Sequence, residues 1–129
     1  ALLSAGMASL FVSSQTASAL DMESAQARQA ARAGVEWGLN KVWQGESGTM
    51  CSTAGTTGNF TDTLAGGFSV TVHCLQRSVP QAGESKTHYE ITAWACNRPK
   101  TPGPACPGDA TAIAGGHYIE RKSFALIEN

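Results

Sequence analysis

Residues 13–43 read SSQTASALDMESAQARQAARAGVEWGLNKVW, and this stretch decides the fold. It contains no proline, and most of its residues favour or tolerate a helix. Its acidic residues come before its basic ones, which is the order that suits the dipole of a helix. The sequence therefore predicts a continuous helix from Ser13 to Trp43, with Gly45 as the residue that ends it.

One face of this predicted helix is apolar and lined by small residues. Ala27 begins a stripe at helical spacing, and its continuation is the expected contact between helix and sheet: Ala31, Val35, Leu39 and Val42. Gly34 and Gly38 lie beside the stripe and would let another backbone come close. The simplest interpretation is a helix that covers one face of its own β-sheet.

The stretch from Ala1 to Val12 (ALLSAGMASLFV) is apolar and precedes the first charge, Asp21. Twelve helical residues cover about 18 Å, against about 30 Å of hydrocarbon in a bilayer, so this stretch alone cannot span a membrane. We expect it to be the remaining part of a transmembrane helix that begins upstream, with residues 1–20 as its residual half and 21–45 as an amphipathic half. An ordinary amphipathic helix is the alternative. The residues expected to contact membrane or partner helices are Leu2, Leu3, Met7, Leu10, Phe11 and Val12.

Composition indicates one small domain with few charges. The chain has 129 residues, a formal charge of −1 and 15% charged residues, without a long basic run. Nucleic-acid binding therefore has no electrostatic support. A hydrophobic fraction of 42% is too high for a disordered chain.

All four cysteines lie in the second part of the chain, residues 46–129, which we expect to form a β domain. None forms a C-x-x-C pair, so two disulfides in an oxidising compartment are favoured over a metal site or free thiols. Spacing alone leaves three pairings open. The proline-rich segment between Cys96 and Cys106 favours a bond that closes this loop, which leaves Cys51 to pair with Cys74.

Alternation of apolar and polar residues predicts two strands in the second half, FSVTVHC (68–74) and HYEITAWA (88–95). We expect an antiparallel hairpin, with SVPQAGESK (78–86) as a turn-rich connection. A third run, HYIERKSFALI (117–127), has apolar residues of both parities, which either a bulge or burial of both faces would explain. A shorter strand is expected near residues 59–64. The predicted fold class is α+β, with one long helix on an antiparallel sheet of about four strands.

This arrangement resembles the type IV pilins. More closely, SALDMESAQARQAARAGVEWGLNKVW (18–43) is similar to the MshP-like minor pilins of mannose-sensitive haemagglutinin pilus systems, in which AARAGVEWG (30–38) is the most specific part. The stretches FSVTVHC, YEITAWAC and HYIERKSFAL support the resemblance. Mature pilins begin with an aromatic residue and carry a glutamate shortly after it. Ala1–Val12 has neither, from which we expect a chain truncated at its N-terminus.

The resemblance implies a structural subunit without enzymatic activity or cofactor, taking part in type IV pilus assembly. Its implied partners are other major and minor pilin subunits, contacted through the N-terminal helix, and the inner membrane before assembly. The implied location is the inner membrane with a periplasmic β domain, and then the extracellular pilus (fimbrium). Two other functions stay open: a periplasmic or secreted domain that binds carbohydrate or protein, and a type II secretion pseudopilin.

Neither a catalytic motif nor a metal-binding pattern is visible in the sequence. His73, His88 and His117 are scattered, although the first two could meet across the hairpin. Trp37 and Trp94 are the candidate partner contacts. Trp37 belongs to the helix motif shared with the pilins, and Trp94 falls on the strand face opposite the expected core. The alternatives are a core tryptophan for Trp37 and burial under the proline-rich loop for Trp94.

Overall fold

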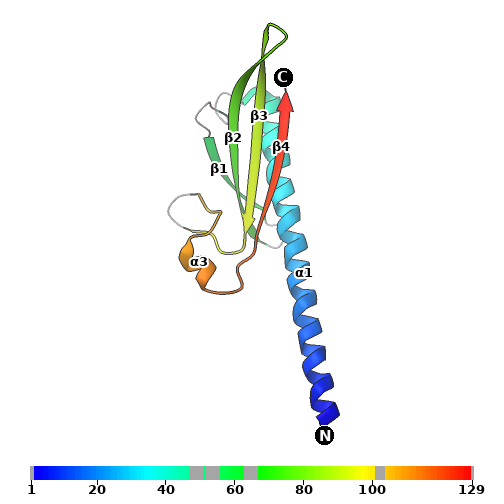
Figure 1. Cartoon of the computed structure of the whole chain (residues 1–129). Helices are drawn as coiled ribbons and strands as arrows, with labels where there is room; N and C mark the ends of the chain where they lie inside the picture. The colour runs from blue at the N-terminus through cyan, green and yellow to red at the C-terminus, as the bar shows by residue number, and fades with distance from the viewer. Residues whose placement is uncertain (1, 47–50, 52–55, 63–66, 101–103, 129) are drawn as a thin grey trace.

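A computed structural model describes residues 2–46, 51, 56–62, 67–100 and 104–128. Within these ranges, the side chains of residues 2–14, 16, 46 and 56–62 are not described. One long helix, α1 (Leu2–Lys41), packs on one face of an antiparallel sheet (Figure 1). The predicted α+β class is therefore confirmed.

Helix α1 begins earlier than the sequence indicated. It is 40 residues long and continues into a π-helical turn, η1 (Val42–Glu46). Gly45 has a φ of 80°, a left-handed conformation in which glycine is not strained, and the helical path ends there as predicted. The helix therefore includes the apolar stretch before Ser13 as well as the amphipathic one after it.

The sheet has the order β1 (Thr56–Asp62), β2 (Phe68–Gln81), β3 (Glu84–Cys96) and β4 (Glu120–Glu128), and each strand is antiparallel to its neighbour. The expectation was about four strands. Three of them, β2, β3 and β4, are described with their side chains, whereas β1 is described through its backbone pairing alone. The helix contacts are concentrated on these three.

Strands β2 and β3 extend through most of the segment expected to be a loop. Only Ala82 and Gly83 form the turn, with φ angles of 49° and 82°, which is the geometry of a tight two-residue hairpin. The pairing of Pro80 with Ser85 belongs to the ladder. The prediction of a turn-rich connection over residues 78–86 was therefore wrong. The hairpin projects beyond the other strands at the end of the sheet remote from the N-terminus (Figure 1).

The core lies between α1 and the sheet and consists largely of small and β-branched side chains. Ala27, Ala30 and Ala31 are fully buried against the sheet. The helix comes so close that a β-carbon placed on Gly38 would lie 2.9 Å from Cγ2 of Ile91. The small residues beside the apolar stripe thus serve the close approach of the chain's own sheet.

Strand β4 resolves the parity that the sequence left open. Its register with β3 is regular from Glu120 to Glu128, so a bulge is not needed. Ala125 and Ile127 pack toward the core, while Phe124 and Leu126 are exposed on the opposite face. The pattern was obscured because polar side chains occupy the helix-facing positions nearer the start of the strand.

Two disulfides join Cys51 to Cys74 and Cys96 to Cys106, the pairing expected from the proline-rich segment. The second bond closes a short loop, after which a small helix, α3 (Ala110–Ala114), leads back to β4. The backbone N–H of Cys106 donates to Oγ1 of the buried Thr71 at 2.9 Å. This hydrogen bond fixes the loop on the sheet face that α1 leaves uncovered.

Candidate assembly surfaces

The first candidate surface is the N-terminal part of α1, residues 2–22, here called the projecting segment. It extends beyond the sheet as a single helix (Figure 1). Leu20 and Met22 have 42% and 65% of their surface exposed, which is unusual for apolar residues of this size. The side chains of the predicted membrane or partner contacts, from Leu2 to Val12, lie outside the described residues. Over the helical residues that the structure describes, α1 is not long and apolar enough to cross a membrane.

The helix is fastened to the domain where the projecting segment ends. Oε2 of Glu23 lies 2.8 Å from Nε2 of His117, and Nη2 of Arg121 donates to Oγ of Ser24 at 2.6 Å. The side chain of Asn97 holds the connection by donating to the carbonyl of His117 at 2.7 Å. These contacts define an anchor that sets the direction in which the helix leaves the sheet.

Sequence reasoning did not find this anchor. The residues of each pair are more than ninety positions apart in the chain. Their only local signals are a histidine just before a predicted strand and an arginine at a core-facing position in β4. Neither signal indicates a contact with the helix without the tertiary fold.

The second candidate surface is the sheet face opposite α1. Phe124 and Leu126 on β4 are 57% and 55% exposed there. Trp94 on β3 is half-buried on the same face, and Nζ of Lys122 lies 5.5 Å from the centre of its ring. The stacked lysine covers one side of the indole, an arrangement that stabilises partly exposed sites modestly. Trp94 therefore lies opposite the core, as its parity predicted.

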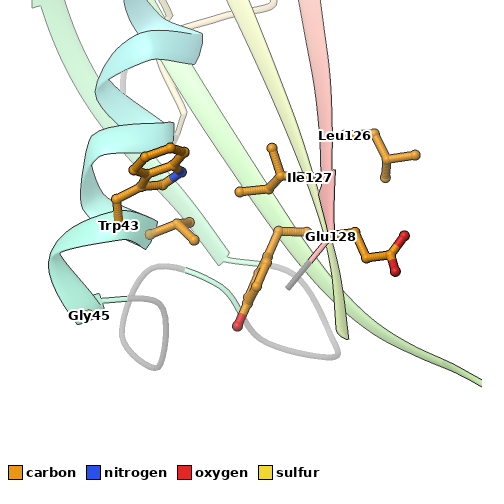
Figure 2. A pocket seen from close by; sticks show the side chains of 7 residues that line it. Trp43, Gly45, Leu126, Ile127 and Glu128 are labelled. Atoms are coloured by element: carbon orange, nitrogen blue, oxygen red, sulfur yellow. The ribbon is translucent and has the colours of Figure 1, made fainter. Parts of the chain in front are cut away.

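A groove of about 700 Å³ lies between the end of the helix and β4. In Figure 2 the side chains of Trp43 and Ile127 lie on the helix side of β4, whereas Leu126 and Glu128 point to the other side. Trp43 is 81% exposed at its mouth. The groove is lined by Val42, Trp43, Gly45, Tyr89, Leu126, Ile127 and Glu128.

The predicted helix–sheet contacts all lie toward the sheet. Ala31 and Val35 are buried, with 0% and 7% exposure, and Leu39 and Val42 pack against the core from its edge. Trp37 also packs partly against the core, and Nζ of Lys41 lies 5.9 Å from its ring centre. Trp37 thus has a structural role within the domain.

The histidines are not gathered into one site. His73 pairs with Thr92 and His88 with Arg77 across the hairpin, so the expected proximity of the two histidines was wrong. His88 faces Glu128 instead, with Nε2 at 3.6 Å from the carboxylate. Among the described residues there is no group of three or more potential metal ligands.

One titratable side chain is clearly perturbed, and its role is structural. Burial and a hydrogen bond to Glu120 raise the pKa of Tyr118 to about 12, and the backbone N–H of Gly108 opposes the shift by donating to the phenol oxygen. The phenol thus joins the C-terminal loop to the start of β4. This bonding holds Tyr118 in its neutral form at physiological pH.

Comparison of the chain with protein-family models, with curated proteins and with solved structures gives no match in any of the three.

Proposed function

We propose that the protein is a structural minor pilin-like subunit that takes part in type IV pilus assembly. In this proposal α1 joins a bundle of like helices from neighbouring subunits, and the disulfide-bonded β domain is displayed outside the bundle. Before assembly, the subunit resides in the inner membrane with its β domain in the periplasm. The chemistry of the subunit is then packing and not catalysis.

The observation that supports this proposal most is the projecting segment. The helix rises 1.5 Å per residue, so residues 2–22 extend about 30 Å beyond the anchor at Glu23. A lone helix of this length has marginal stability in water. It becomes stable when neighbouring helices or lipid cover its apolar side chains, of which Leu20 and Met22 are the described examples.

The test uses the full-length gene product in its natural host. We expect it to fractionate with the inner membrane and to depend on the pilus assembly machinery to leave it. Deleting the gene should reduce or alter piliation, while a soluble cytoplasmic enzyme measured in parallel keeps its activity. A freely soluble product together with normal piliation in the deletion strain would support an independent binding domain instead.

A matched pair of variants separates assembly from folding. Leu20→Glu with Met22→Glu places charges on exposed positions of the projecting segment, so the melting temperature should stay unchanged while incorporation into pili falls. Gln29→Glu, on an exposed face of the sheet-bound part of α1, is the control and should leave incorporation unchanged. Equal incorporation of all three proteins would contradict the role of the projecting segment.

A further inference from the structure

Strand β4 forms one edge of the sheet, because the strand order ends with it. It is nine residues long and contains no proline, two features that leave an edge able to pair with another strand. On the face away from α1 it presents Phe124 and Leu126, each more than half exposed, between a lysine and a glutamate. An edge of this kind exposes both backbone groups and apolar side chains.

The sequence of β4 is complementary to itself when two copies run antiparallel. We propose that a second copy of this chain pairs with β4 about a two-fold axis at Ala125. In this register Lys122 of each copy lies opposite Glu128 of the other, and Phe124 lies opposite Leu126. Directly opposed side chains of opposite charge, and opposed apolar side chains, each stabilise an antiparallel pair.

Neighbouring registers lack this match. A two-fold axis at Phe124 places Glu120 opposite Glu128 and Lys122 opposite Leu126. An axis at Ser123 places Lys122 opposite Phe124. A shift of one residue from any of these would turn the core-facing side chains to the wrong face. Only the axis at Ala125 joins both the charges and the apolar residues.

The existing side-chain contacts are compatible with this pairing. Lys122 is exposed and lies above Trp94, so its ammonium group can also reach a carboxylate across the strand. The side chain of Glu128 is 47% exposed beside His88. Both charges are thus already held on the face where their counterparts would arrive.

The helices leave room for the second copy. Helix α1 contacts β2, β3 and β4, so it lies over the middle of these strands. With strands spaced about 4.8 Å apart, the two β3 strands of the pair are about 14 Å apart, more than the 8–10 Å between packed helices. The groove beside the exposed Trp43 lies on the β4 side of α1 and would face the second copy (Figure 2).

This pairing is independent of the proposed pilin function and differs from it in geometry. An axis perpendicular to the sheet places both α1 helices on the same face, pointing in opposite directions. Two subunits of one helix bundle have parallel helices, so they cannot also form this contact with each other. The contact therefore joins β domains that approach from opposite sides.

A charge-swap experiment on the full chain tests the proposal by analytical ultracentrifugation. Lys122→Glu and Glu128→Lys should each weaken self-association by about tenfold or more, because each places like charges opposite one another twice. An equimolar mixture of the two variants should associate like the wild type, since every opposed pair is then of opposite charge. Glu84→Lys, at the exposed hairpin tip, is the control and should associate like the wild type.

The mixture also excludes trivial causes. A variant that failed to fold could not regain association by mixing, and association through the projecting segment would not depend on charges in β4. A monomeric wild type, single variants that associate as strongly as the wild type, or a mixture that stays monomeric would each overturn the proposal. None of these results bears on fractionation or piliation, so the proposed function is tested separately.

Discussion

Gly34 of α1 lies against Val70 of β2 so closely that a β-carbon on the glycine would be 2.5 Å from Cγ1 of the valine. Gly34→Ala should therefore destabilise the fold by about 1–3 kcal/mol through overpacking, despite the better helix propensity of alanine. Urea denaturation measures the change. Combined with Val70→Ala, which removes the opposing methyl groups, the substitution should cost less than the sum of the two single changes. Strict additivity would show that the two residues do not constrain each other.

A charge in the stripe that faces the sheet should be costly. Val35 is 7% exposed in the core, and Val35→Asp would bury a carboxylate for which no partner is available. We expect a loss of about 3 kcal/mol or more in the free energy of unfolding. Gln29→Asp adds the same charge at an exposed position of the helix and should change stability little. Similar melting temperatures for the two variants would contradict the packing of Val35.

The loop disulfide should contribute to stability and be detectable directly. Mass mapping of unreduced peptides should find Cys96 joined to Cys106 and Cys51 joined to Cys74. Replacing Cys96 and Cys106 together with serine should lower the free energy of unfolding by about 2–3 kcal/mol, the value expected for a short closed loop. Four alkylatable thiols in the native protein under oxidising conditions would refute the pairing.

Tyr118 should titrate late. The chain has two tyrosines, so absorbance near the phenolate band can follow both, and one ionisation should occur at about pH 12. Because folding raises the pKa of Tyr118 above its usual 10, its contribution to stability is complete below pH 10 and is lost as the pH rises toward 12. Tyr118→Phe should remove the late ionisation, whereas Tyr89→Phe should retain it. A late phase that survives Tyr118→Phe would exclude this assignment.

The sequence predicted the local features well because period and composition report them directly. The apolar stripe from Ala31 to Val42 identified the face of α1 that meets the sheet, and the prolines identified the loop closed by Cys96 and Cys106. It failed at the β2–β3 connection, where Pro80 and Gly83 suggested a longer loop. A hairpin turn needs only two residues of left-handed conformation, and proline can remain in a ladder near a strand end.

The anchor and the groove could not be predicted in the same way. Each joins residues that are far apart in the chain, such as Ser24 with Arg121 or Trp43 with Ile127. Arg121 even misled the reading of β4, because a polar residue on the core side breaks the alternation. Its position is explained only by the hydroxyl that the helix brings opposite it.

The direction of α1 relative to the strands determines how the domain responds to load. The helix runs along the strands, and its contacts extend from the anchor at Glu23 to the groove at Trp43 (Figure 1). A force that pulls the β domain along the helix axis therefore acts in shear on all these contacts together. A force applied across the sheet would open them one after another from one end. The molecule should withstand tension along its long axis far better than tension applied sideways.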